Sequence, residues 1–248
     1  TPYEMLRSLV GSEMCIRDSA NSFQLSNVGI DDDTIGSVSF DGISDRLDIG
    51  GHSDFVLGSG DFTFECWIKT DNKTQDGGIN RRIFKLDGPT AGSALGNIAI
   101  YVVSGTGAIR AKSTNNPDST TVTGTTDVSD NVWHNITLTR SSGILRLFVD
   151  GVLEASATNN IILSANSGSP RPRIGSDSGS AGDFDGNISN LRIIKGAARY
   201  VSNFTVSKAP LEKLDGTILL CCKNAGSATA SDVSPSCLLY TSPSPRDS

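Results

Sequence analysis

Hydrophobic and polar positions alternate along much of the chain with the period of two that is typical of β-strands. The clearest case is the segment Phe62–Thr70. One face of that segment carries Phe62, Phe64, Cys66 and Ile68, and the other carries Thr63, Glu65, Trp67 and Lys69. Cys66 stands among the apolar residues, so we expect it to be a small buried hydrophobe.

The same pattern predicts a series of short strands between residues 37 and 222. They are Ser37–Phe40, Arg46–Ile49, Phe62–Thr70, Arg82–Leu86, Asn97–Val103, Ala108–Ser113, Val132–Arg140, Ile144–Val149, Val152–Ala157, Pro172–Ile174, Gly186–Ile194 and Thr217–Cys222. Asp-Gly and Gly-Gly pairs separate several of them, and Asp150-Gly151 is typical of a two-residue hairpin turn. Many short strands with such turns indicate a sandwich or a barrel.

Two stretches are predicted to be loops. Asn115–Asp130 is rich in Thr, Asn and Asp and contains Pro117, whereas residues 164–185 are rich in Ser and Gly. Long loops on a rigid scaffold commonly carry ligand-binding residues. We therefore expect any ligand to bind at the rim loops 115–130 and 164–185.

The two ends of the chain differ from its middle. Residues 1–19 and 236–248 both finish on Arg-Asp-Ser, and each contains one cysteine. Both ends resemble translated sequencing-adapter read-through, as found on translations of environmental reads. A signal peptide is the alternative at the front, but Glu4, Arg7 and Glu13 interrupt an apolar core of the usual length. We therefore expect both ends to be artefactual tails on a fragment.

Four ordered phrases of the middle resemble one known family. They are Phe40-Asp41-Gly42 with Asp45 and Leu47-Asp48-Ile49, the strand Asp61–Ile68, the stretch from Trp133-His134 to Asp150-Gly151, and Phe184–Ile193. Together they resemble the laminin-G-like, concanavalin A-like lectin and glucanase domains. Lys195–Tyr200 with Asn203–Thr205 resembles the variant found in tail-associated structural proteins of marine bacteriophages.

This resemblance implies an all-β fold, an antiparallel two-sheet jelly-roll sandwich of the concanavalin A-like type. The expected organisation is a lead segment at residues 20–36, one jelly-roll domain at 37–214, and the start of a truncated following module at 215–235. The family's closing motif often has an acid after its isoleucine. Ser189-Asn190 stands there in this chain, so a role that needs a carboxylate at that position is not expected.

Composition narrows the classes of function. The chain has 248 residues and a net charge of −6, which argues against a broad nucleic-acid surface. No apolar run reaches the roughly 20 residues that cross a bilayer. The middle cysteines, Cys66, Cys221 and Cys222, match neither a disulfide framework nor a zinc spacing. We therefore expect neither a nucleic-acid partner nor a membrane partner.

Catalytic patterns are weak in this sequence. Glycoside hydrolysis usually needs two carboxyl groups that face each other across the sugar. The middle contains only Glu65, Glu154 and Glu212, each without an acidic partner on its strand. No nucleophile elbow opens a helix, and His134 is expected to be a strand residue bonded to backbone. The sequence therefore predicts that the chain is not an enzyme.

Trp67 and Trp133 have two interpretations. Their rings could stack on sugars, but their positions match strand-embedded tryptophans of the family, and we expect them to pack in the core. Calcium is the cofactor that the resemblance suggests, because members of the superfamily often hold this ion at the sandwich edge. Asp183 and Asp185 are the candidate ligands, with Asp31–Asp33 and Asp41 with Asp45 as others. The alternative is that these aspartates only form turns.

The sequence thus predicts a non-catalytic recognition or structural module of a phage tail or fibre protein, located in the virion or outside the cell. Its expected partners are surface glycans, or another cell-surface ligand, and other virion subunits. Two alternatives remain at this point. One is a purely architectural spacer or decoration domain without a soluble ligand, and the other is an enzyme acting on polysaccharide.

Overall fold

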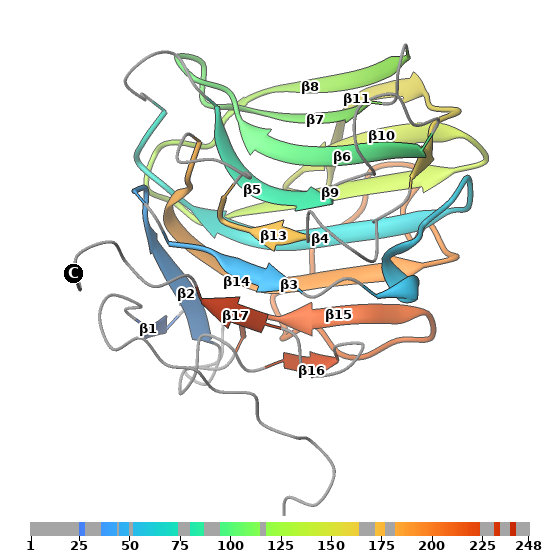
Figure 1. Ribbon diagram of the computed structural model, residues 1–248. Coiled ribbons are helices and arrows are strands. Elements are labelled where there is room, and N and C mark those ends of the chain that lie inside the picture. The colour runs from blue at the N-terminus through green and yellow to red at the C-terminus, as the bar shows by residue number, and fades with distance from the viewer. Residues whose placement is uncertain are drawn as a thin grey trace, which may run out of the picture.

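The computed structural model shows two antiparallel sheets packed face to face (Figure 1). It describes residues 25–27, 36–43, 45–49, 52–73, 80–86, 95–114, 118–163, 172–176, 182–223, 231–233 and 239–241. The predicted fold class, an all-β jelly-roll sandwich of the concanavalin A-like type, is confirmed. A short 3₁₀ turn, η1 (Ser53–Phe55), is the helical element of the described residues.

The first sheet has the strand order β1-β2-β14-β4-β9-β10-β11, and β15 and β16 extend it beside β14. Its strands are β1 (Leu25–Asn27), β2 (Gly36–Asp41), β4 (Phe62–Lys69), β9 (His134–Ser141), β10 (Ile144–Val149), β11 (Val152–Thr158), β14 (Asp185–Lys195), β15 (Thr217–Cys221) and β16 (Ser231–Val233). One edge of β14 pairs with β4. Its other edge pairs first with β2 and then with β15.

The second sheet has the order β17-β3-β13-β5-β6-β7-β8, and β12 runs parallel to β6. Its strands are β3 (Leu47–Ile49), β5 (Arg81–Leu86), β6 (Leu95–Val102), β7 (Ala108–Thr114), β8 (Ser119–Asp127), β12 (Ile162–Leu163), β13 (Arg173–Ile174) and β17 (Leu239–Thr241). Figure 1 shows β3, β13, β5, β6, β7 and β8 side by side as one layer.

The core lies between the two sheets and is formed by alternate residues of their strands. In β4 the apolar set Phe62, Phe64, Cys66 and Ile68 is at most 2% exposed, which confirms the predicted alternation and the burial of Cys66. Burial also raises the pKa of the Cys66 thiol. Leu145, Leu147 and Val149 of β10 face the same core.

The predicted Asp-Gly hairpin is confirmed. Val149 pairs with Val152, and the two residues between them have positive φ angles of 50° for Asp150 and 79° for Gly151. This type of two-residue turn has positive φ at both central residues. Hairpins favour it because its twist matches the right-handed twist of the strands. The turn fixes the register of β10 with β11.

The prediction of a loop over 115–130 was wrong for residues 119–127, which form β8, while residues 115–117 lie outside the described residues. Thr121, Thr123 and Thr125 are exposed, while Val122 and Gly124 between them are buried. Threonine is β-branched and fits a pleated, half-buried edge, so a polar composition is compatible with a strand here. Of the second predicted loop, residues 164–171 and 177–181 lie outside the described residues, and 173–174 form β13.

The domain boundaries stay predictions. β1 lies in the predicted lead segment and pairs with β2, while β17 lies in the predicted tail and pairs with β3. Thr217–Cys221, placed in the predicted following module, forms β15 and is hydrogen-bonded to β14. Leu219, Leu220 and Cys221 are fully buried, so this strand belongs to the packed sandwich.

Candidate functional site

The outer face of the second sheet carries an unusual concentration of basic side chains. Strand alternation places them there: Ile98, Ile100 and Val102 of β6 point into the core, and Ala99 and Tyr101 point outwards. Register then aligns the outward residues of the neighbouring strands with these two. We call this surface the cationic face and define it by Arg46, Arg82, Lys85, Arg110, Lys112 and Arg173, with Asp48 among them.

The strand pairings arrange the cationic face in two rows. The first row crosses six strands from Asp48 through Arg173, Lys85, Ala99 and Lys112 to Thr121. The second row runs from Arg82 through Tyr101 and Arg110 to Thr123. Neighbouring strands lie roughly 4.8 Å apart. The basic groups are therefore held at fixed spacings by the sheet itself.

Local contacts orient several of these cations. Asp48 accepts from Arg46 Nε at 3.0 Å and from Arg173 Nε at 2.6 Å. The guanidinium carbon of Arg82 lies 4.5 Å from the centre of the Tyr101 ring, a cation–π arrangement. Arg110 Nε donates to Thr123 Oγ1 at 2.9 Å. Lys112 is exposed and the other five cations are half-buried, so all six retain some contact with solvent.

Hydroxyl groups border the cationic face along the edge strand β8. Thr121, Thr123 and Thr125 are exposed, and each hydroxyl can donate one hydrogen bond and accept two. The backbone amide of Thr125 donates to Glu154 Oε2 of β11 at 2.8 Å, and this bond ties β8 to the other sheet. The edge is therefore both polar and held in place.

The outer face of the first sheet is covered by residues 196–215, which we call the covering segment. Ala197 accepts from the Thr63 hydroxyl at 2.9 Å, and Tyr200 accepts from the Thr139 hydroxyl at 2.8 Å. Farther along, Phe204 donates its amide to the Gly151 carbonyl at 2.9 Å. The polar side chains Thr63, Thr137 and Thr139 are fully buried, because this segment shields them from solvent.

The prediction that Trp67 and Trp133 pack in the core was wrong. Both side chains are half-buried. Trp67 shares its face of β4 with Thr63 and Glu65, opposite the apolar set, so it points to the outer side of the first sheet. Trp133 precedes β9 and has the same parity as Asn135, which pairs with Trp67. The alternation of β4 already contained this information about Trp67.

The side chains of Glu65 and Glu154 and the backbone of Glu212 make structural contacts. Glu65 is buried, and its Oε1 accepts from Arg192 Nη2 at 2.6 Å and Nε at 2.9 Å. Glu154 accepts from the β8 backbone. Glu212 is exposed, and its backbone carbonyl accepts from Arg192 Nη1 at 2.6 Å. The contacts of Arg192 hold β4, β14 and the covering segment together, and those of Glu154 join β11 to β8.

His134 differs from its prediction, because its ring bonds to two carboxylates and not to backbone. Nδ1 lies 2.7 Å from Asp150 Oδ2, and Nε2 lies 3.1 Å from Asp130 Oδ1. The hydrogen bond to Asp150 raises the pKa of His134. Burial opposes this rise, whereas the charge of Asp150 and the hydrogen bond to Asp130 add to it. The sequence offered the i, i+4 spacing of Asp130 and His134 but no sign of Asp150.

Of the two aspartates predicted to bind calcium, Asp185 is the first residue of β14 and pairs with Asp41 at the end of β2, and Asp183 lies two residues before it. Asp185 accepts from Asn72 Nδ2 at 2.8 Å, while Asp183 is 3% exposed. One Asp183 oxygen has no hydrogen-bond partner among the described residues, and burial raises the pKa of this carboxyl.

The other candidate pair, Asp41 and Asp45, is used by a local turn. Asp41 Oδ1 accepts from the amides of Ile43 and Asp45 at 2.9 and 3.3 Å. Within the described part of the chain, no three His, Cys, Asp or Glu side chains group in a way that could hold a metal ion. Asp31–Asp33 lie outside the described residues. Calcium binding therefore stays a prediction.

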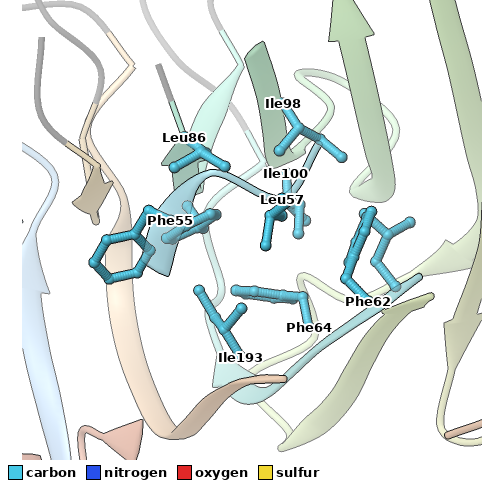
Figure 2. A pocket seen from close by; sticks show the side chains of 10 residues that line it. Phe55, Leu57, Phe62, Phe64, Leu86, Ile98, Ile100 and Ile193 are labelled. Atoms are coloured by element: carbon cyan, nitrogen blue, oxygen red, sulfur yellow. The ribbon is translucent and has the colours of Figure 1, made fainter. Parts of the chain in front are cut away.

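The interior of the sandwich contains a small apolar cavity of about 10 Å³, shown in Figure 2. Its lining comes from both sheets and from the turn after β3, and consists of Phe55, Leu57, Phe62, Phe64, Phe84, Leu86, Ile98, Ile100, Leu138 and Ile193. This volume would hold about one water molecule, and water needs polar partners that the lining does not offer. The cavity is a packing gap and not a ligand site.

No helix among the described residues has the length and hydrophobicity that a membrane-spanning helix needs.

Comparisons with known proteins agree with this architecture. A carbohydrate binding protein candidate from Bacteroides ovatus superposes with a TM-score of 0.51 and 16% identity. The match covers 75% of this chain and 50% of that one, so the chain spans half the length of that relative. Domain 4 of AbnA, an extracellular arabinanase from Geobacillus stearothermophilus solved in complex with arabinotriose, gives a TM-score of 0.52 and 18% identity, over 75% of this chain and 81% of that one.

None of the curated proteins that were compared matches the chain. The family model for laminin-G-like domains matches residues 41–199, from the end of β2 into the covering segment. With most of the sandwich inside that match, the chain belongs to the concanavalin A-like lectin/glucanases superfamily.

Proposed function

We propose that this chain is a non-catalytic module that recognises glycans. The observation that carries the proposal is the outer face of the second sheet, where half-buried and exposed polar side chains stand on fixed strands. Such a face offers charge-assisted and hydroxyl hydrogen bonds without any change of backbone. Membership of a superfamily that includes lectins, and structural similarity to a candidate carbohydrate binding protein, support it.

A glycan array probed with the full chain tests this proposal. We expect reproducible binding to a subset of glycans and no loss of polymer length when bound polysaccharide is recovered. Binding to no glycan, with and without added calcium, would contradict the proposal and leave the architectural spacer as the better interpretation. Shortened polymer would indicate an enzyme.

A calcium ion near Asp183 is a second, separate proposal. Its support is the buried Asp183 oxygen that has no partner among the described residues, in a carboxyl whose pKa is raised by burial and, to a smaller extent, by the charge of Asp41. We expect millimolar calcium to raise the melting temperature, since a ligand that binds only the folded state stabilises it. Asp183→Asn should abolish that rise. An equal rise in the variant would place any ion elsewhere.

We further propose that the module belongs to a structural protein of a phage particle, and that it works outside the host cell. The support is the resemblance of Lys195–Tyr200 and Asn203–Thr205, which run from the last residue of β14 into the covering segment. Neighbouring genes in an untrimmed assembly test this. Genes for tail or capsid proteins on both sides are expected, and a neighbourhood of metabolic enzymes would contradict the proposal.

A further inference from the structure

The two adjacent cysteines at the end of β15 lie closer together than a regular strand would place them. Along a strand, neighbouring side chains point to opposite faces. Leu219 and Cys221 accordingly pack in the core, while Leu220 between them pairs with Arg192 and shares its outer side. Cys222 breaks this alternation, because its side chain packs in the same core as that of Cys221. The two sulfur atoms are 3.7 Å apart.

The backbone of Cys222 accounts for this arrangement. Its φ angle is 60°, in the left-handed region that residues with a side chain seldom adopt. The Cys222 carbonyl accepts from the Asn190 amide at 3.0 Å, and this bond holds the residue beside β14. Residues that their surroundings keep in such a conformation are concentrated at functional sites. Here the strained residue is one of the two cysteines whose thiols meet.

Cys66 is the third cysteine of the described residues, and it is poorly placed to bond with this pair. It lies on β4, and β14 separates β4 from β15. Two strand spacings are roughly 10 Å, whereas the Cα atoms of a disulfide are usually about 4–7 Å apart. Burial also raises the pKa of the Cys66 thiol, and the neighbouring Cys222 adds to that rise. The reactive thiolate of Cys66 is therefore scarce.

We propose that Cys221 and Cys222 form a reversible disulfide by exchange with a small-molecule disulfide such as oxidised glutathione, and that this bond fixes the end of β15. The sulfur atoms, now 3.7 Å apart, must approach to about 2.05 Å. Cα atoms of adjacent residues are only about 3.8 Å apart, closer than in ordinary disulfides, so the ring is strained. Strained disulfides are readily reduced and serve as reversible switches.

The exchange takes two steps. The thiolate of one cysteine attacks a sulfur of the small disulfide, and one of its two thiolates leaves. The second cysteine thiolate attacks the mixed disulfide, the S–S bond between Cys221 and Cys222 forms, and the second small thiolate leaves. Two protein thiols are oxidised, and the small disulfide is reduced to two thiols that take up both protons. Both cysteines are at most 1% exposed, so the exchange precedes closure of the core or follows a local opening of β15.

The bond is expected to respond to the place where the chain works. Thiols meet oxidising conditions outside cells and are kept reduced in the cytosol. Folding brings the two sulfur atoms together, so it favours the bond. By thermodynamic reciprocity, the bond then favours the folded state by the same factor. Oxidation outside the cell would thus fix the end of β15 without linking distant parts of the chain.

Peptide mapping of the full chain tests whether the bond forms. Trypsin cleaves after Lys213 and Lys223, so both cysteines lie in one peptide, residues 214–223. The folded chain is equilibrated with reduced and oxidised glutathione, quenched with acid, and then unfolded and alkylated. We expect this peptide to be lighter by two hydrogen atoms and to carry no alkyl group.

Three outcomes of the mapping would overturn the proposal. They are two alkylated cysteines in that peptide, a glutathione adduct as the final product, and a link between two tryptic peptides through Cys15, Cys66 or Cys237. Cys66→Ala is the matched control, because it removes a buried thiol of the same core. It should leave the disulfide within the peptide unchanged.

A second measurement tests whether the bond fixes the end of β15. The same glutathione buffers with concentrated urea provide the unfolded reference, and each equilibrium is approached from both the reduced and the oxidised form. We expect the ratio of bonded to free pairs to be about tenfold higher in the folded chain than in urea. An equal or lower ratio in the folded chain would overturn the proposed effect on β15.

Hydrogen exchange provides a local readout of the same effect. The Asn190 amide donates to the Cys222 carbonyl, so its exchange should slow when the native chain is oxidised. Cys222→Ser cannot form the bond and should exchange this amide at the same rate in both buffers. Exchange in the native chain that does not change on oxidation would show that the bond leaves β15 as it was, and would overturn the proposal.

Discussion

At the scale of single residues, buried polar side chains hold this sandwich together where its loops cross. Arg140 is fully buried yet bonded to four loop positions. It donates to the carbonyls of Gly58, Gly60 and Ile161 at 2.6–2.9 Å and to the Asn159 side chain at 3.2 Å. Burial lowers the pKa of this guanidinium, and the opposing effect of the Asp61 charge is smaller. One side chain thus joins two loops that are distant in the sequence.

Replacing Arg140 with lysine should destabilise the fold. Lysine keeps the charge but loses the planar fork, so several buried carbonyls lose their donor. We expect the free energy of unfolding, measured by urea denaturation, to fall by about 2–3 kcal/mol. Arg146→Lys is the control, because Arg146 has only an exposed bond to the Ile144 carbonyl. Its effect should stay within about 0.5 kcal/mol, and equal losses in both variants would contradict this role of Arg140.

His134 should make stability depend on pH. Because its folded-state pKa is raised above the usual 6.5, the protonated ring stabilises the fold fully below pH 6.5. That stabilisation is lost as pH rises through the raised value. Urea midpoints measured from pH 6 to 9 should therefore decline in the native chain. They should change less in His134→Gln, while His52→Gln should retain the native dependence.

Asp130, which contacts His134, affects stability over a different pH range. Burial alone would raise the pKa of Asp130, but hydrogen bonds from the Val132 amide and from His134 outweigh it and lower the pKa. A carboxyl group whose pKa is lowered by folding stabilises the folded state at pH values above its unfolded-state pKa. That stabilisation is lost as the pH falls through the folded-state pKa. The decline predicted for His134 therefore lies at higher pH than any contribution of Asp130, and the two are separable by titration.

At the scale of elements, the covering segment depends on one turn of the β10–β11 hairpin. A Cβ added to Gly151 would lie 2.1 Å from the Phe204 carbonyl oxygen, which belongs to that segment. Phe204 also packs edge-on against Phe148 and stacks on Tyr200 at 3.6 Å between ring centres. The hairpin turn and the covering segment are therefore fitted to each other.

Gly151→Ala and Gly105→Ala form a matched pair. Their φ angles are 79° and 82°, so both substitutions carry a similar backbone penalty of about 1–2 kcal/mol. Gly105 has nothing within 4 Å of an added Cβ. We expect Gly151→Ala to be the more destabilising by at least about 1 kcal/mol and to speed hydrogen exchange at the Phe204 amide. Similar costs at both glycines would argue against this contact.

The elements also show what could be predicted from the sequence. The alternation in β4 and the Asp-Gly turn are local patterns. The structure contains the β4 strand and the β10–β11 hairpin that these patterns predict. β8 was missed because its threonines were interpreted as loop residues, although their alternation with Val122 and Gly124 is visible. The rows of the cationic face could not be predicted, because they depend on register between strands that are distant in sequence.

At the scale of the whole molecule, β15 should be essential to the fold. Leu219, Leu220 and Cys221 are fully buried beside β14, and a buried leucine contributes about 1.5–3 kcal/mol. Two such residues contribute about 3–6 kcal/mol together, which is comparable with the lower end of the total stability of domains, about 5–15 kcal/mol.

A chain that ends at residue 214 should therefore lose cooperative thermal unfolding, whereas one that ends at residue 223 should keep it. Differential scanning calorimetry distinguishes the two. Equal melting temperatures would show that β15 is dispensable and would support the predicted domain boundary at 214. Loss of the transition in the shorter chain would move that boundary beyond β15.

The position of β14 has a consequence for synthesis on the ribosome. This strand lies between β2 and β4, although some 115 residues separate its start from the end of β4. Until residues 185–195 leave the exit tunnel, both β2 and β4 have an unpaired edge that other chains could join. Contacts between such distant segments also form slowly. Newly made chains should thus fold late and benefit from chaperones that shield those edges.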